Sequence, residues 1–352
     1  MGKHILFMIH GIGIHEPTWA EEPDGPAKTL QQLSKEYAFF KKKELSSLVM
    51  PISVHYDEIF QGQIKEWQQD AGRVSQIDPT GTLAHSLTWL SSASEQNFWW
   101  SHVADLAMYM LSPLYRNRVR IRVISQIADV IEQTMDNDGS ATCSVLAHSM
   151  GTAVAHDSLH LLGTVRWGGH ENVLNPRHWR FNHLFMVANT SRLLQTVDEG
   201  MKKAYDSIVR PGPIEDPSSY CATYWNFRHE ADPVPYPRMF EPVGWKNYNS
   251  VVVRHYREVN IHNLSHYLLN PRVHIPILRK LCGPRAVTNN EEITAVNSDK
   301  YPQFGGQLEF INKAKDLAAR LKSIQASLGD DPAATDYLKA LLKMYALWEA
   351  YT

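Results

Sequence analysis

A single serine stands at a position suited to nucleophilic catalysis. Ser149 follows an apolar run over 141–147 that is typical of a buried strand, and the small residues after it favour a helix. The flanking positions are also small, with Ala147 two residues before the serine and Gly151 two residues after it. A serine on a sharp strand-to-helix turn needs such neighbours, because bulky ones would collide with the strand and the helix. The spacing therefore predicts a nucleophile, and a helix-capping serine is the alternative.

A serine that attacks an acyl group needs backbone N–H groups directed at the oxygen that becomes negative. The Met150 N–H is one candidate, because it opens the helix after the serine, where the helix dipole favours negative charge. The second is in the segment HGIG (10–13) after the apolar run 4–10, and it is assigned to the Ile12 N–H. A nucleotide-binding loop is the competing interpretation, but Glu16 stands where the pattern G-x-G-x-x-G requires its third glycine.

These two segments resemble those of the α/β-hydrolase superfamily, especially its lipase and serine-esterase branch. The resemblance is carried by ILFMIHGIGI, by VLAHSMGTAVAHDSL and by their order, and it covers roughly residues 3–60 and 117–282. Ala147 replaces the first glycine that the serine motif of this superfamily usually has. The resemblance implies a triad in the chain order Ser, then Asp or Glu, then His.

The acid of such a triad is expected just after a late strand. Asp232 lies in a D-P-V turn after the strand predicted at 220–227, and the proline stiffens this loop. Its carboxylate would accept the Nδ1–H of the histidine and hold the imidazole in one tautomer. Glu230 is the rival acid, and an aspartate of an ordinary surface turn is the alternative without a catalytic role.

The base is expected after the next strand, predicted at 251–259. Both His262 and His266 lie there, and the Ser-His-Tyr-Leu string around His266 resembles the catalytic-histidine loop of several esterases. His266 is therefore the predicted base and His262 the alternative. The predicted reaction is cleavage of a carboxylic ester through an acyl-enzyme on Ser149, with Asp232 behind the base. A thioesterase, an amidase or an acyltransferase would use the same triad, and a non-catalytic binding or scaffold protein would keep only the fold.

Strand and helix signals alternate along the chain that must position these residues. Strands are predicted at 4–10, 48–56, 141–147, 183–188, 220–227 and 251–259, and helices at 26–45, at 117–135 and after Ser149. This alternation predicts an α/β fold with a mostly parallel central sheet and helices on both faces. Residues 1–282 are the predicted α/β-hydrolase domain. A polar loop over 283–304 and an amphipathic helical hairpin make 283–352 an accessory segment.

A tryptophan-rich helical insert over 57–116 interrupts the predicted domain. Phe98, Trp99 and Trp100 could line an apolar channel over the site, so that the substrate is a small-molecule or lipid-like ester with an apolar acyl or aromatic group. Aromatic residues at helical spacing are otherwise core residues. The apolar stripe of the C-terminal hairpin must pack on the body or on another subunit, which would make a homo-oligomer.

Composition argues against several classes of function, among them nucleic-acid binding, metal binding and membrane insertion. The 35 Lys and Arg against 37 Asp and Glu give a net charge of −2, which offers no general attraction to nucleic acid. The three cysteines are widely separated and predict neither disulfides nor a metal knuckle. His156 and His160 have a metal-chelating spacing, but no HExxH pattern accompanies it, so no metal and no cofactor are expected. Without a signal peptide or a membrane-length apolar stretch, a cytoplasmic protein with no integral membrane segment is predicted.

Overall fold

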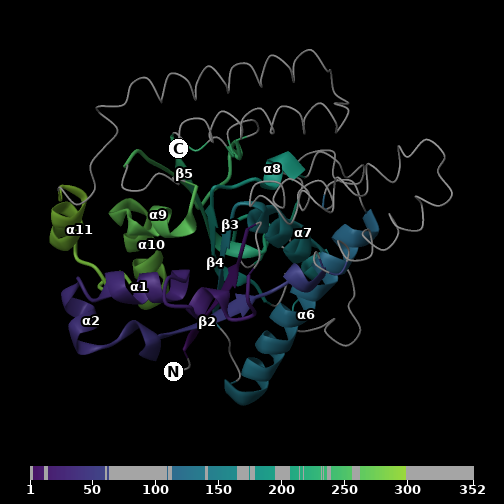
Figure 1. Cartoon of the computed structure of the whole chain (residues 1–352), viewed down its shortest axis with the longest axis horizontal. Coiled ribbons are helices and arrows are strands. Elements are labelled where there is room, and N and C mark those ends of the chain that lie inside the picture. Colours follow the sequence, from purple (N-terminus) through teal and green to yellow (C-terminus); the bar gives the residue numbers. More distant parts are fainter. Residues whose placement is uncertain are drawn as a thin grey trace, which may run out of the picture.

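Six parallel strands form the central sheet of the computed structural model, in the order β2-β1-β3-β4-β5-β6 (Figure 1). They are β1 (His4–Ile9), β2 (Val49–Val54), β3 (Cys143–His148), β4 (Phe181–Val187), β5 (Cys221–His229) and β6 (Tyr248–Val253). The structure describes residues 3–11, 15–59, 62, 109, 113–138, 142–164, 174, 179–194, 207–213, 215–216, 218–230, 232, 234–235, 239–255 and 262–298. Each strand overlaps a predicted one, and the α/β class is confirmed.

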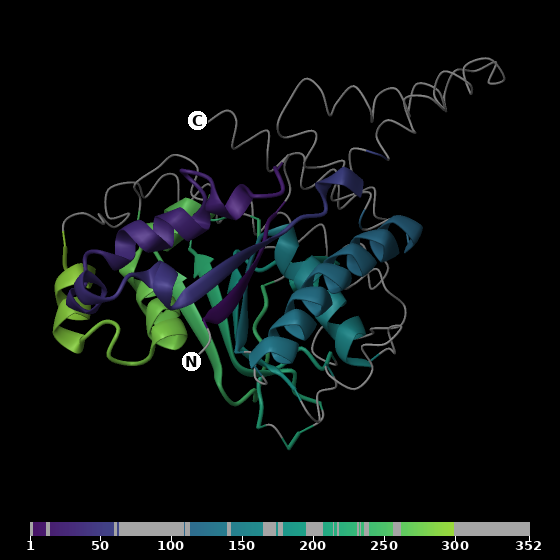
Figure 2. The ribbon, with the colours of Figure 1, turned by 90° about the horizontal axis from the view of Figure 1, so that it is seen from below.

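Helices cover both faces of the sheet (Figure 2). Two long helices lie on one face, α6 (Pro113–Asp138) and α7 (Met150–Thr164). The other face carries α1 (Pro26–Ser34), α9 (Leu264–Leu269) and α10 (Pro271–Cys282). The shorter elements are η1 (Trp19–Glu21), α2 (Ala38–Lys42), η2 (Leu45–Ser47), α8 (Ser191–Leu194) and α11 (Asn289–Val296).

Alternate residues of β1 belong to two different cores. Ile5, Phe7 and Ile9 pack in the core beneath α6 and α7, whereas Leu6 and Met8 pack in the core beneath α1 and α10. All five side chains are at most 1% exposed, so β1 is buried on both faces, as its continuous apolar run predicts. The end of β1, next to the candidate site, is thus fixed by a hydrophobic core on each face of the sheet.

The strand order reverses between β1 and β3. The chain runs from β1 to its neighbour β2 on one side and returns through α6 to β3 on the other side of β1. In open parallel sheets such a switch point leaves a crevice at the carboxyl ends of the strands, where ligands bind. The pairing of β1 with β3 runs from Ile5 opposite Cys143 to Ile9 opposite Ala147, so both strands end at the same edge of the sheet.

Residues 26–45 form three short elements and not the one helix that was predicted. α1 ends at Ser34, and α2 and η2 follow it. The interruption occurs at Tyr37, which is buried and whose hydroxyl lies 2.6 Å from Nε2 of His274 in α10. This long-range hydrogen bond turns the chain inward where the local pattern favoured a continuing helix.

The polar stretch after Cys282 also differs from the prediction, because it contains α11 within the expected loop 283–304. A reciprocal capping box begins this helix: the Thr288 hydroxyl accepts the Glu291 N–H, and the Glu291 carboxylate accepts the Thr288 N–H. The T-x-x-E signal was present in the sequence without an apolar stripe to accompany it.

Two predicted features lie outside the described residues. They are most of the insert over 57–116, including Trp99 and Trp100, and the helical hairpin beyond residue 298. The apolar channel and the homo-oligomer therefore stay predictions. Among the helices that the structure describes, none is both long and apolar enough to cross a membrane.

Candidate functional site

Ser149 stands on a strained turn between β3 and α7. Its φ angle is +54°, in the left-handed region that residues other than glycine rarely adopt. β3 ends at His148 and α7 begins at Met150, so this one residue makes the whole turn. The Ser149 N–H donates to the Val187 carbonyl at 3.0 Å, which ties the turn to the end of β4. Strain of this kind persists where the surroundings enforce it, and it marks functional positions.

Close backbone packing explains the small residues around the serine. A Cβ atom on Gly151 would lie 2.1 Å from the His10 carbonyl oxygen and 2.7 Å from that of Ile9. A Cβ atom on Gly11 would lie 3.0 Å from Cβ of Ser149. The first turn of α7 therefore rests directly on the end of β1, and the loop after β1 passes against the serine.

A continuous hydrogen-bonded chain links the serine to a histidine and an aspartate. The Ser149 Oγ lies 2.8 Å from Nε2 of His262, and Nδ1 of the same ring lies 2.8 Å from Oδ2 of Asp232. The three side chains come from the loops after β3, β5 and β6. Because a carboxylate can only accept, Nδ1 carries the ring proton and Nε2 offers its lone pair to the serine hydroxyl.

Asp232 is held by three donors. Besides the His262 ring, the Tyr267 hydroxyl donates to Oδ2 at 2.7 Å and the Val234 N–H donates to Oδ1 at 3.0 Å. Burial alone would raise the pKa of this carboxyl group. Electrostatic attraction by the adjacent His262 ring and the three hydrogen bonds outweigh burial and hold the pKa of Asp232 below its ordinary value. The carboxylate is therefore ionised at neutral pH.

His262, and not the predicted His266, contacts the serine. His266 lies inside α9 with its ring buried and stacked on His255, with ring centroids 4.2 Å apart and planes 11° apart. Asn263 caps α9, since its side chain accepts the Ser265 N–H. His262 thus lies in the turn before the helix, where its ring reaches the strand ends, whereas His266 is carried inward to the helix–sheet interface.

The other predicted polar residues have different partners. Glu230, the rival acid, forms an ion pair with Arg254. His156 Nε2 lies 2.9 Å from the Tyr224 hydroxyl, and His160 Nδ1 lies 3.2 Å from Oγ of Ser207. The two histidines of α7 are thus engaged with separate hydroxyl groups.

Two residues of the site were missed by the sequence reasoning. His148 precedes the serine, and its Nε2 lies 2.7 Å from the His262 carbonyl, so the strand that leads to Ser149 also holds the backbone of His262. Tyr267 reaches Asp232 from α9 and accepts the His229 N–H at 2.9 Å. The signal for His148 was its place beside Ser149 in the chain. Tyr267 had no such local signal, because its role depends on the contact between α9 and the end of β5.

Of the two predicted oxyanion donors, the structure describes only Met150. Met150 is the first residue of α7, where the N–H has no acceptor within the helix. Ile12 lies outside the described residues.

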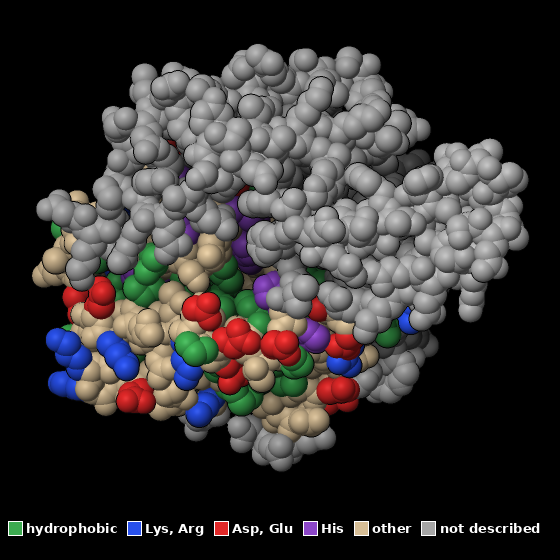
Figure 3. All heavy atoms as spheres, in the orientation of Figure 1, with side chains coloured by type: hydrophobic (Ala, Val, Ile, Leu, Met, Phe, Trp, Pro, Cys, Tyr) green, Lys and Arg blue, Asp and Glu red, His purple; other side chains and the backbone are tan. Residues whose placement is uncertain are grey.

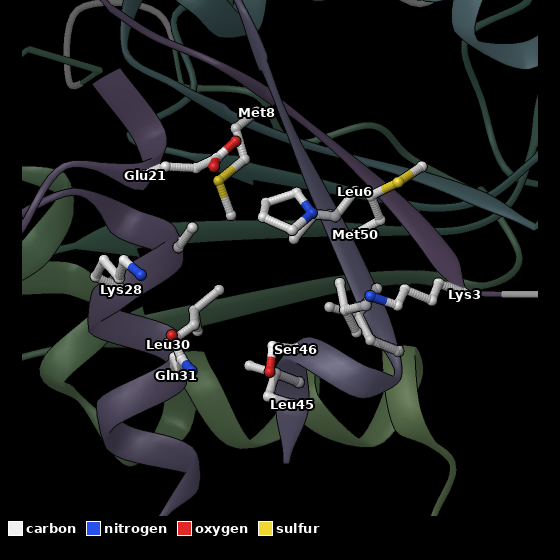
Figure 4. Close-up of a pocket in the computed structure, with 14 residues that line it drawn as sticks. Lys3, Leu6, Met8, Glu21, Lys28, Leu30, Gln31, Leu45, Ser46 and Met50 are labelled. Carbon is white, nitrogen blue, oxygen red and sulfur yellow. The ribbon is translucent and has the colours of Figure 1, made fainter. Parts of the chain in front are cut away.

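Histidine side chains gather in the middle of the face seen in Figure 3. A separate pocket of about 360 Å³ opens between β1, β2 and α1 (Figure 4). None of Ser149, Asp232 and His262 lines it. Its walls combine apolar and charged side chains, among them Leu6, Met8, Leu30, Lys3, Glu21 and Lys28. This pocket is therefore not part of the hydrogen-bonded site.

The sequence matches no protein-family model and no curated protein. Among solved structures, a similar one is an uncharacterized protein from Pseudomonas aeruginosa, at 11% identity and a TM-score of 0.36 over 90% of this chain and 51% of that protein. The chain thus spans about half the length of that protein. A likeness at this level carries no information about the function.

Proposed function

We propose that this protein is a serine hydrolase that cleaves carboxylic esters through an acyl-enzyme on Ser149, on a fold of the α/β-hydrolase type. The hydrogen-bonded chain from Ser149 through His262 to Asp232, with 2.8 Å at each step, carries the proposal. A serine, an imidazole and a buried carboxylate in this order form the arrangement that activates a hydroxyl group for attack on an acyl carbon. The strained turn at Ser149 supports the same role.

His262 moves the protons in this mechanism. As the Ser149 oxygen bonds to the acyl carbon, its proton passes to Nε2, and the resulting imidazolium is stabilised by ionised Asp232 at Nδ1. The tetrahedral intermediate then breaks its bond to the alkoxy group, which leaves with the proton from Nε2. A water molecule then bonds to the acyl carbon while its proton passes to Nε2, and Nε2 returns this proton to Ser149 Oγ as the bond to the serine breaks and the acid leaves.

The first turn of α7 supplies charge stabilisation. The Met150 N–H and the dipole of this 15-residue helix favour the negative oxygen of the tetrahedral intermediate. The second donor in this proposal is the Ile12 N–H of the loop after β1. Gly11, in the same loop, passes against Ser149, which agrees with a donor at this edge of the crevice.

A fluorophosphonate probe on the full chain tests the activated serine. We expect wild-type protein to be labelled at Ser149, located by peptide mass spectrometry, and S149A to show neither labelling nor hydrolysis of aryl esters, with turnover lower by about 10⁴-fold or more. Wild-type protein that is folded but unlabelled, or S149A with unchanged turnover, would contradict the proposal and favour a binding or scaffold protein.

The choice of base is tested with a matched pair of variants. H262Q should lose about as much turnover as S149A, because no group takes the serine proton. H266Q should retain most of the turnover if it folds, since the His266 ring stacks on His255 away from the serine. The opposite ranking, in variants with equal circular dichroism spectra, would return the role of base to His266. Competing ester, thioester and amide substrates then identify the bond, and an acyl-chain series identifies the preferred length.

A further inference from the structure

A second group of polar side chains lies where β1 and β2 end, beside the proposed triad. His10 directly follows β1, Asp57 comes shortly after β2, and His15 lies between the two strands in the chain. One potential ligand atom from each of these three residues lies within 4.8 Å of the other two. Imidazole nitrogen and carboxylate oxygen are ligands that zinc and similar divalent transition metals accept.

The His10 ring is prepared to donate a lone pair. The side chain is 1% exposed, and Nδ1 lies 2.8 Å from the Gly11 carbonyl. Since a carbonyl can only accept, Nδ1 is the protonated nitrogen and Nε2 carries the lone pair. Within the described part of the chain, this buried Nε2 has no hydrogen-bond partner. A ring whose other nitrogen is fixed by a backbone carbonyl is the usual state of a metal-binding histidine.

Asp57 directs one oxygen at this lone pair. Oδ2 accepts the His15 N–H at 2.5 Å, while Oδ1 lies 3.6 Å from Nε2 of His10, too far for a hydrogen bond between them. Two ligands about 2.0–2.1 Å from a tetrahedral zinc ion are about 3.3 Å apart, so a small inward movement would bring both atoms to bonding distance.

We propose that His10 Nε2, Asp57 Oδ1 and a ring nitrogen of His15 bind one divalent transition-metal ion of the zinc class, with water completing the coordination. The ion joins the chain after β1 to the chain after β2. Because the His10 backbone also supports the first turn of α7, the ion braces the strand ends on which Ser149 stands. The role of the ion is structural, and binding of the ion does not depend on the proposed hydrolase activity.

The other close histidine group, His229, His255 and His266, is organised differently. Both ring nitrogens of His255 are engaged, with Nε2 2.8 Å from the His266 carbonyl and Nδ1 2.7 Å from Nδ2 of Asn270. His229 Nε2 in turn lies 2.7 Å from the His255 carbonyl. These contacts describe hydrogen-bonded packing behind Asp232, so a metal there would have to displace them.

Cobalt titration of the full chain tests the site. The protein is stripped with a chelator, Co²⁺ is added, and the visible absorption of tetrahedral cobalt is followed, with Zn²⁺ as competitor. We expect one ion per chain with bands of nitrogen and oxygen ligands and no thiolate band. H15A and D57N should weaken binding by more than the roughly 10- to 100-fold that outer-shell partners of a metal site typically cost.

Two further histidine variants serve as controls. H160Q removes a histidine of α7, and H229Q removes one from the second group; both should bind cobalt as the wild type does. Circular dichroism checks that each variant is folded, and D57N alone suffices should H15A fail to fold. Absence of stoichiometric binding, binding unaffected by D57N and H15A, or binding abolished by H229Q would overturn the proposal.

Discussion

Asp232 is the most firmly held residue of the proposed triad. Its side chain is fully buried, and Oδ2 accepts from both the His262 ring and the Tyr267 hydroxyl. Hydrogen bonds to an ionised group are the stronger kind, and two of them on one oxygen leave the carboxylate a single orientation. Since Tyr267 does not touch Ser149 or His262 in the hydrogen-bond pattern, we regard it as a positioning residue that acts through Asp232.

The variant Y267F tests this role, which depends on the proposed function. It removes one charge-assisted hydrogen bond worth about 1.5–3 kcal/mol, so we expect kcat for an aryl ester to fall by about 10- to 100-fold while KM changes little. Steady-state kinetics measures both constants. Y220F is the matched control, because Tyr220 is equally buried but its hydroxyl donates to the Leu174 carbonyl away from the triad. Equal losses in the two variants would assign Tyr267 a merely structural part.

At the level of elements, the contact between α7 and the end of β1 positions Ser149. Gly151 permits this contact, because its missing Cβ would fall 2.1 Å from the backbone oxygen of His10. The backbone at the end of β1 is buried, and it cannot move aside as the end of a flexible side chain can. The glycine two residues after the serine is thus a packing requirement of the turn.

The variant G151A should therefore be strongly destabilised. Overpacking a buried contact costs about 1–3 kcal/mol, and a rigid backbone neighbour places this site at or above the upper end. Urea unfolding followed by circular dichroism measures the loss. G62A is the control, since a Cβ on Gly62 meets nothing within 4 Å among the residues that the structure describes. A G151A protein as stable as G62A would show that α7 can shift without cost.

The strands and the turn at Ser149 were predictable, because both are encoded locally. Apolar runs of strand length marked β1 and β3, and small residues around Ser149 marked the turn. Which histidine contacts Ser149 was not predictable from the same information. Two histidines four residues apart follow β6, and the choice between His262 and His266 depends on where α9 begins. That boundary is set by the Asn263 cap and by the packing of α9 on the sheet. A resemblance between short sequence motifs contains no information about this packing.

For the molecule as a whole, buried histidines make stability depend on pH. Burial lowers the pKa of His156 to about 3 and that of His274 to about 4, from an ordinary value of 6.5. Both rings are uncharged in the folded protein and bind protons once the chain unfolds. The stability that they contribute is fully present above pH 6.5 and is lost as pH falls below 6.5 toward the folded pKa values.

We accordingly expect the free energy of unfolding to fall as pH is lowered from about 6 to 4. Each such histidine adds about 1.4 kcal/mol per pH unit to the slope. Urea unfolding at a series of pH values measures it. In H156Q the side chain can still contact the Tyr224 hydroxyl but cannot titrate, so the slope should be shallower by about this amount. Parallel curves for H156Q and the wild type would contradict the assignment.

The hydrogen bond between Ser149 and His262 joins residues that are 113 positions apart in the chain. During synthesis, Ser149 and its turn leave the ribosome long before β5, β6 and His262 exist. Loops of this length close slowly because their entropy must be lost before the contact forms. In a partly made chain, or one that is still refolding, the Ser149 hydroxyl therefore lacks its His262 partner, and the proposed activation of the serine requires the strand β6 to be in place.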